Sequence, residues 1–480
     1  MIGANTPKRP RLLSRTALGM ALALGTVAGS ALVATPAMAA KKQSYNFTKP
    51  FQAAAGPANK AIDDAAKRAD VVAASAKVTQ AEQAANAARG DARKQAEAAA
   101  DAAIAELGNL LSNEKALVAT AFGAIGNEDD RFMAGNLKLT LGNVARDVAM
   151  QREGLQAMLQ SGKANPADVP KFNFFVGRFS MIMNDYPAAV SALQAAIDGG
   201  YHENNADILL VEAQSNAGQV PQALATLRKS VDAARAAGRP IPEQWYTRGY
   251  QIAYRAKMGD ATNEWAAEAA RANPSPFNWL GALQLVREFG NFTSHEEVDV
   301  GRLMKRTGAL GYDARAASRE YIEFVQAAVK WRLWPEANAA IAEGISVGAL
   351  NASDPFVTDA KAQVRAGAAA EAADLAGAMR DAPKAANGLT AFGAGDMLLS
   401  KGDAAQAETF YQMALSKGGI DRDRALTRLA IAQYDQGKYA DAKATFAQVG
   451  GNRAALARLG AILAEQKMAP AAAAPAPAAN

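Results

Sequence analysis

The stretch "GKYADAKATFAQV", from Gly437 to Val449, places a glycine, a tyrosine and small or apolar residues at fixed steps. Glycine adopts the left-handed conformation that ends an α-helix at little cost, so Gly437 is predicted to end one helix. The next helix is predicted to begin at Tyr439. Ala442, Phe446 and Val449 follow at spacings that share one face of that helix. An alanine at the third step allows two helices to approach closely.

The same pattern occurs a second time, upstream, in "KGDAAQAETFYQMAL". Gly402 is predicted to end a helix there, and Ala407 and Tyr411 are predicted to line one face of the next. Ala407 precedes Ala442 by 35 residues. Two copies at this interval predict a repeating unit made of two helices and a short turn.

Further copies extend the repeat towards the N-terminus. Steps of 35 residues lead from Ala407 back to Ala372, where Gly367 is the predicted helix terminator, and then to Ala337. Ala223 and Ala189 are 34 residues apart. Proline is accepted in the first turn of a helix, where its missing N–H costs nothing. Three copies carry such a proline two positions before the alanine, in the pairs Tyr186-Pro187, Val220-Pro221 and Trp334-Pro335.

A period of 34–35 residues with paired helices resembles the tetratricopeptide repeat family. Gly437, Tyr439, Ala442 and Phe446 match the second-helix pattern of that family, and Gly177 matches its first-helix glycine. The resemblance implies an all-α fold, a right-handed solenoid of antiparallel helix pairs over residues 130–467. It also implies a concave groove, lined by the first helix of each pair, that binds a protein or peptide segment. An alanine-rich helical bundle without repeats is the alternative.

The first 39 residues are predicted to be a signal peptide. Four basic residues, Lys8, Arg9, Arg11 and Arg15, precede an apolar run and the small-residue sequence Ala37–Ala39. Cleavage is expected near Ala39 or Ala40, which predicts a periplasmic or secreted protein with no membrane span afterwards. An uncleaved anchor is the alternative. The formal net charge of +5 falls to about +1 without the leader, so the charge gives no support to nucleic-acid binding.

Two further segments are predicted between the leader and the repeats. Residues 40–57 are predicted to be an extended lead-in, because Pro50 and Pro57 disfavour a helix. Residues 58–129 are rich in alanine, the best helix former, and predict a helical arm that is broken near Gly90. A structural role in which this arm mediates self-association is one possible function.

The C-terminal end of the chain is predicted to contain a cap and a tail. The helix expected after Gly451, "NRAALARLGAILAEQK", has no second helix to pair with and is predicted to be a solvating cap. Residues 468–480 contain mostly alanine and proline, which cannot build a core and predict a disordered tail.

The sequence carries little that predicts chemistry. It contains no cysteine and only two histidines, His202 and His295, so no metal site and no cofactor are expected. Common catalytic motifs are also missing, so no catalytic residue is predicted. The acidic run "GNEDDRF" (Gly126–Phe132) lacks the ligand spacing of a calcium loop and is interpreted as acids at a helix N-terminus.

One local feature suggests a binding site. Tyr246, Tyr250 and Tyr254 are four residues apart and therefore lie along one side of a helix. If Trp245 and Gly249 occupy first-helix positions of the family, these tyrosines face the groove. Packing between helices is the alternative.

Together these patterns predict a non-catalytic periplasmic scaffold or adaptor that binds a peptide segment or another cell-envelope protein. An envelope protein that binds or cleaves glycans on a superhelical fold is the alternative. Some peptidoglycan lyases carry such a fold, but their Glu-Ser pair does not occur in this sequence.

Overall fold

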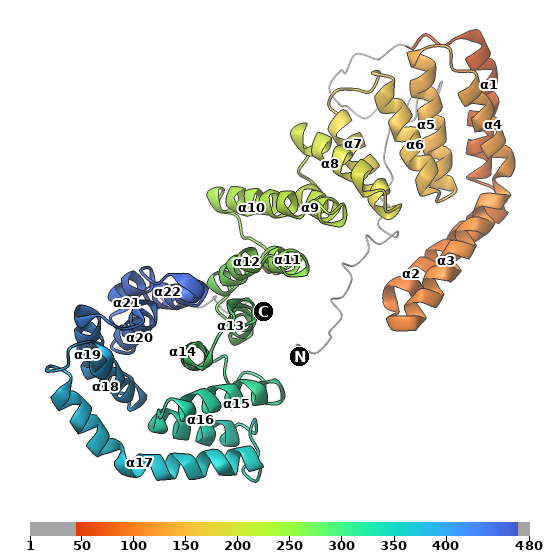
Figure 1. Cartoon of the computed structure of the whole chain (residues 1–480). Helices are drawn as coiled ribbons and strands as arrows, with labels where there is room; N and C mark the ends of the chain where they lie inside the picture. Colours follow the sequence, from red (N-terminus) through yellow and green to blue (C-terminus); the bar gives the residue numbers. More distant parts are fainter. Residues whose placement is uncertain (1–44, 469–480) are drawn as a thin grey trace, which may run out of the picture. The chain divides into compact units, whose positions relative to one another are not determined.

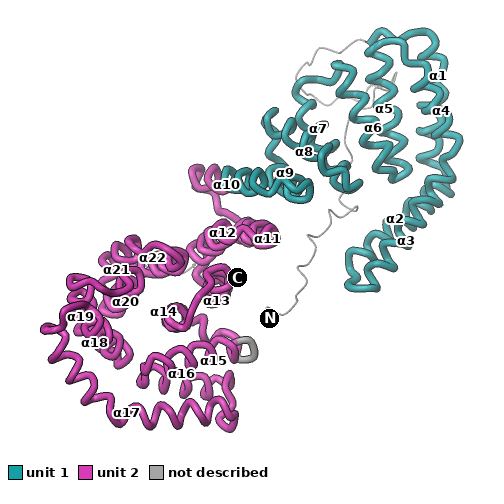
Figure 2. The backbone as a smooth tube through the Cα atoms, in the orientation of Figure 1, with its two compact units in different colours: residues 1–230 teal, residues 231–480 magenta. Residues whose placement is uncertain are grey.

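The computed structural model describes residues 45–468, which form 22 α-helices and no strand. The predicted signal peptide and all of the predicted tail except Met468 lie outside the described residues. The chain divides into two compact units, residues 1–230 and residues 231–480 (Figure 2). Consecutive helices pack as antiparallel pairs (Figure 1). The predicted all-α solenoid of tetratricopeptide-like helix pairs is therefore confirmed.

The helices of unit 1 pack mainly on their neighbours in sequence. They are α1 (Lys49–Ala65), α2 (Ala69–Ala87), α3 (Gly90–Leu110), α4 (Ser112–Gly123), α5 (Glu128–Val144), α6 (Val148–Gln160), α7 (Val169–Ile182), α8 (Tyr186–Asp198), α9 (Ala206–Asn216) and α10 (Val220–Ala236), the last of which crosses the boundary.

The predicted extended lead-in is wrong from Lys49 onwards, because α1 begins there. Pro50 lies in the first turn, where a helix does not need its N–H, whereas Pro57 lies inside the helix. A proline in a helix interior costs about 3 kcal/mol. Burial of Phe51 and Ile62 against the core of unit 1 offsets this local cost.

The acidic run at Gly126–Phe132 caps the N-terminus of α5, as its interpretation predicted. The Asn127 side chain accepts a hydrogen bond from the backbone N–H of Asp130. The fully buried Asp130 carboxylate accepts two more from Thr48, from its N–H at 3.0 Å and its hydroxyl at 2.7 Å. These bonds fix the start of α1 to the start of α5.

The alanine-rich region forms an antiparallel hairpin of α2 and α3. The chain turns between Ala87 and Gly90, beside the predicted break, and Gly90 adopts a φ of +58°. Small side chains, among them Ala74 and Ala103, are buried along the hairpin. Small residues therefore allow these two helices to pack closely.

Unit 2 contains the remaining helices. They are α11 (Glu243–Arg255), α12 (Gly259–Ala272), α13 (Pro276–Gly290), α14 (Ser294–Arg306), α15 (Ala314–Lys330), α16 (Trp334–Ser346), α17 (Pro355–Asp381), α18 (Leu389–Ser400), α19 (Ala404–Lys417), α20 (Arg422–Asp435), α21 (Tyr439–Phe446) and α22 (Ala454–Met468), with a 3₁₀ turn, η2 (Gly451–Arg453), before α22.

Helices α12–α22 close into a ring, which we call the unit 2 ring (Figure 1). The ring closes because α22 packs on α12 and α13 as well as on α21. The Gln466 side chain donates a hydrogen bond to the carbonyl of Ala270 at 2.9 Å across this closure. The predicted solvating cap is therefore wrong. Leu456, Leu459 and Ile462 of α22 are buried, and α22 packs on α12 and α13, far upstream in the sequence, as well as on its neighbour α21.

The alanines of the predicted repeat lie at helix contacts in every copy except one. Ala189, Ala223, Ala337, Ala407 and Ala442 have no exposed surface. The exception is Ala372, which is exposed in the middle of α17. There the repeat prediction is wrong, because α17 is one continuous helix of 27 residues.

The glycines of the repeat act in two ways. Gly402 and Gly437 follow helix ends with φ values of +85° and +77°, in the left-handed region. Gly177 and Gly367 instead allow close packing. A Cβ on Gly177 would meet the Leu193 side chain at 2.5 Å, and one on Gly367 would meet the indole of Trp334 at 2.1 Å. The prediction that Gly367 ends a helix is therefore wrong, because this glycine lies inside α17.

The aromatic residues of the repeat lie mostly in the core. Tyr411 and Phe446 are buried, and Tyr411 donates a hydrogen bond to Asp396 at 2.7 Å. Tyr186 and Tyr439 are the first residues of α8 and α21.

The contact at Ala442 gives a direct test of this packing. Replacing Ala442 by phenylalanine should cost about 1–3 kcal/mol, because the site has no space for a ring. The matched control is Ala444→Phe, which places the same ring on the exposed face of α21. Urea unfolding monitored by tryptophan fluorescence reports on unit 2, since all five tryptophans lie there. Equal unfolding midpoints for the two variants would contradict the assigned helix pairing.

Candidate functional site

The three tyrosines of α11 lie in three different environments. Tyr246 is 3% exposed and packs near the ring of Trp265, with 6.5 Å between centroids. Tyr250 is half-buried, and burial raises the pKa of its hydroxyl. Tyr254 is 37% exposed and rests edge-on against Phe289 at 5.7 Å. One tyrosine therefore belongs to the core, and the other two reach the surface. Their part in partner binding stays a prediction.

The interior of the unit 2 ring is occupied by α14. Figure 1 shows this helix inside the ring, and its residues are buried on all of its sides. A helix that is buried all round normally carries only apolar residues. Val298, Val300 and Met304 fit that rule, but Asp299 and Arg302 on the same helix are also completely buried. These charges need partners within the ring.

Asp299 is the centre of a buried ionic cluster. Its Oδ1 accepts hydrogen bonds from Arg428 Nε at 3.0 Å and from Arg302 Nη1 at 3.4 Å. Its Oδ2 accepts one from Arg453 Nη1 at 2.6 Å. Burial opposes ionisation of this carboxyl, but the three guanidinium groups outweigh it and hold the pKa of Asp299 below its usual value. Asp299 is therefore ionised and shared by three arginines.

Each of the three arginines also reaches a second carboxylate. The pairs are Arg302 with Glu336 at 2.8 Å, Arg453 with Glu296 at 2.6 Å, and Arg428 with Asp396. The four carboxylates and three guanidinium groups connect α14 to α16, α18, α20 and η2. We call these seven residues the Asp299 cluster. The charges are therefore paired, which is the condition under which charged groups can be buried.

Sequence reasoning missed the Asp299 cluster. Arg428 and Arg453 lie 129 and 154 positions after Asp299 in the chain. No local spacing connects them, because they meet only when the ring closes. The one usable signal was an aspartate and an arginine, Asp299 and Arg302, on an otherwise apolar stretch of α14.

The described residues show no metal site and no membrane span. Within residues 45–468, no group of three or more histidine or acidic side chains is arranged to hold a metal ion. His202 contacts a single carboxylate, Asp207, at 3.0 Å. No helix in this range is long and apolar enough to cross a membrane.

Comparisons with known proteins give little further information. No protein-family model matches this chain, and no curated protein matches it. A search of solved structures finds the TPR2AB domain of yeast Sti1 in complex with pHSP90, at 16% identity and a TM-score of 0.22. The match covers 62% of this chain and 98% of that one. At this level of likeness nothing is carried over from that protein, and the helix pairs themselves define the fold.

Neutralising Asp299 tests the ionic cluster. Asp299→Asn leaves three buried arginines without their shared charge, and breaking a buried ion pair in this way costs about 3–5 kcal/mol. The control is Asp381→Asn, which removes an aspartate that pairs with Arg380 at the surface and should leave the unfolding midpoint of unit 2 unchanged. Urea unfolding by tryptophan fluorescence measures both. A midpoint for Asp299→Asn equal to that of the control would contradict the pairing.

Proposed function

We propose that this protein is a non-catalytic scaffold or adaptor that binds a peptide segment or another protein of the cell envelope. Stacked helix pairs support this proposal, because such repeats present extended surfaces to partners. The α14 helix lies inside the unit 2 ring and is buried on all of its sides, so we propose that a partner of this unit binds to the outer faces and rims of the ring.

The observation that carries the proposal is the exposed aromatic surface of α11. Tyr246 anchors the helix in the core, and Tyr250 and Tyr254 reach the surface on the same helix, with Phe289 beside Tyr254. Tyrosine suits such a surface, since it offers a large apolar ring and a hydroxyl that seeks a hydrogen bond. We propose that Tyr250 and Tyr254 contact the partner directly.

We further propose that residues 1–39 export the chain and that it works in the periplasm. The basic residues, the apolar run and the sequence Ala37–Ala39 support this step. A partner in the cell envelope follows from that location.

Truncation of Tyr254 tests the proposed binding surface. Tyr254→Ala should weaken partner capture about 30-fold, which corresponds to the loss of about 2 kcal/mol at an aromatic hot spot. Fluorescence unfolding should change little, because the side chain is partly exposed. Phe277→Ala, which removes another exposed aromatic ring of unit 2, is the matched control and should capture the partner normally.

The measurement uses the mature chain, purified from the periplasm and immobilised, with cell-envelope extract as the source of partners. N-terminal sequencing of that chain should begin after Ala39 or Ala40. Equal capture of the partner by wild type and Tyr254→Ala would overturn the proposal that Tyr254 contacts the partner. A chain that still begins at Met1 would overturn the export step.

A further inference from the structure

Arg287 of α13 contacts three glutamates that come from α14 and α15. Its Nε atom lies 2.9 Å from Glu297 Oε2, and its Nη1 atom lies 2.6 Å from Glu320 Oε2 and 2.7 Å from Glu323 Oε2. Both α13 and α15 pack against α14. We call these four residues the Arg287 cluster. One guanidinium group therefore connects three helices of the unit 2 ring.

The Arg287 cluster is largely withdrawn from solvent, but its hydrogen bonds are incomplete. Side-chain exposure is 2% for Glu320, 11% for Arg287, 18% for Glu297 and 25% for Glu323. Glu320 accepts hydrogen bonds from Gln284 Nε2 at 2.8 Å and from Arg287 Nη1 at 2.6 Å. The Oε2 atoms of Glu297 and Glu323 are buried and accept no hydrogen bond from any described residue. Two buried carboxylate oxygens therefore lack a donor.

Negative charge exceeds positive charge in this cluster. Arg319 of α15 supplies a second positive charge, because it pairs with Glu323 at 2.6 Å. Its side chain is 55% exposed, however, so water screens much of its effect. Three carboxylates therefore share one buried and one exposed guanidinium group. At Asp299 the opposite holds, since three guanidinium groups contact a single carboxylate.

Other charged groups on α13 and α14 do not offset the excess. Glu288, which follows Arg287 on α13, is an exposed carboxylate and adds negative charge. Glu296, which precedes Glu297 on α14, pairs with Arg453 at 2.6 Å, so each of these charges is already matched. The excess at the Arg287 cluster therefore stays uncompensated by these two helices.

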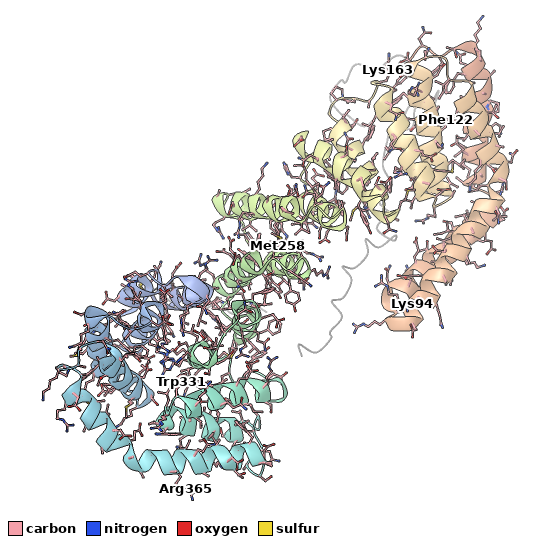
Figure 3. The ribbon with its side chains drawn as sticks, viewed as in Figure 1. Lys94, Phe122, Lys163, Met258, Trp331 and Arg365 are labelled. Atoms are coloured by element: carbon pink, nitrogen blue, oxygen red, sulfur yellow. The ribbon has the colours of Figure 1, made fainter. Side chains whose placement is uncertain are left out.

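An aromatic contact lies beside the cluster, where α15 ends. Trp331, which Figure 3 labels, stacks on the imidazole of His295 with ring centroids 3.5 Å apart. Its Nε1 atom donates a hydrogen bond to Ser294 Oγ at 3.1 Å, and Lys330 Nζ lies over the indole, 5.8 Å from its centroid. Burial and the nearby arginines lower the pKa of His295 to about 4, so the imidazole is uncharged at neutral pH.

The Glu297 carboxyl responds to its surroundings. Burial raises the pKa of this group above its usual value. Arg287 opposes the shift, but the negative charges of Glu323 and Glu320 add to it. A carboxyl group with a raised pKa binds a proton more tightly in the folded chain than in the unfolded chain. Its ionisation therefore lowers the stability of the fold as the pH rises.

We propose that the Arg287 cluster is a proton-sensitive contact between α13, α14 and α15, in which Glu297 takes up a proton from mildly acidic solvent and thereby stabilises unit 2. The proton adds to a carboxylate oxygen and forms an O–H bond. Two guanidinium groups and three carboxylates give the cluster and Arg319 together a charge of −1, which the proton brings to zero. The new O–H is also a donor in a place where two buried oxygens lack one.

The direction of this effect can be separated from that of His295. As the pH falls from neutral towards about 4.3, the usual pKa of a glutamate, the folded chain protonates Glu297 before the unfolded chain does, and stability rises. His295 acts in the opposite direction, because its lowered pKa means that the unfolded chain takes up that proton first. The wild-type profile contains both effects, so the test compares variants. It does not rest on the proposed partner binding.

Glu297→Gln tests the contact, because glutamine is an uncharged analogue of the protonated side chain. Urea unfolding of the mature chain by tryptophan fluorescence should give a higher midpoint for Glu297→Gln than for wild type at about pH 7.5. This difference should shrink as the pH falls to about 5 and the wild type becomes protonated. The matched control is Glu288→Gln, which removes an exposed carboxylate from α13 and should differ from wild type by the same small amount at every pH.

A second comparison assigns the effect to the cluster. In a Glu323→Gln background, the pH dependence of the Glu297→Gln difference should be smaller, because one of the carboxylates that repel Glu297 is gone. The proposal is overturned if the Glu297→Gln difference stays constant or grows as the pH falls, or if Glu323→Gln leaves its pH dependence unchanged. Failure of Glu297→Gln to fold would also overturn it, since the uncharged side chain is the form that the fold should favour.

Discussion

The carboxylate of Asp299 is the group on which the architecture of unit 2 depends. It is fully buried and bonds to three arginines that come from α14, α20 and η2. An isolated charge in such a place would cost many kcal/mol, and three arginines without an anion would cost still more. These charges can be buried in the folded unit only when all members of the Asp299 cluster are present. The position of α14, the path of α20 and the turn before α22 are therefore set together.

This constraint explains why the stacked helix pairs of unit 2 close into a ring. A repeat of helix pairs normally leaves a concave surface to solvent. Here the chain places α14 within that surface, and the salt bridges of Arg302, Arg428 and Arg453 attach it to α16, α20 and η2. The α22 helix then completes the ring by packing on α12 and α13. The partner that we propose for this unit therefore contacts exposed residues outside the ring and at its edge.

The helix pairing could be predicted from the sequence because it depends on local spacing. An alanine such as Ala442 or Ala407 sits at a fixed step after a helix-ending glycine, and the structure places both at contacts without exposed surface. The same spacing predicted a repeat unit at Ala372 that the structure does not contain. No local sequence feature indicates that α17 continues past Gly367 without a break. At Pro57 the sequence predicted an extended segment where the structure has a helix. Burial of apolar residues in α1 outweighs the unfavourable proline.

The candidate sites were predictable only in part. The spacing of the α11 tyrosines places them on one helix, but their burial depends on neighbours such as Trp265 and Phe289. Asp299 and Arg453 are separated by 154 residues, and closure of the ring brings them together. A single sequence carries no signal for such a pairing. The stacking of His295 on Trp331 is also a tertiary contact, because His295 lies on α14 and Trp331 lies in the turn after α15.

Hydrogen exchange of the α14 amides tests most directly whether this helix is locked inside the ring. If the Asp299 cluster holds it there, the amides from Val300 to Met304 can exchange only when unit 2 unfolds. Their free energy of opening should then equal that of the buried amides of α20, from Leu429 to Ala432. A much lower opening free energy for α14 alone would mean that the helix leaves the ring while the other helices stay folded, and it would contradict the central role of the cluster.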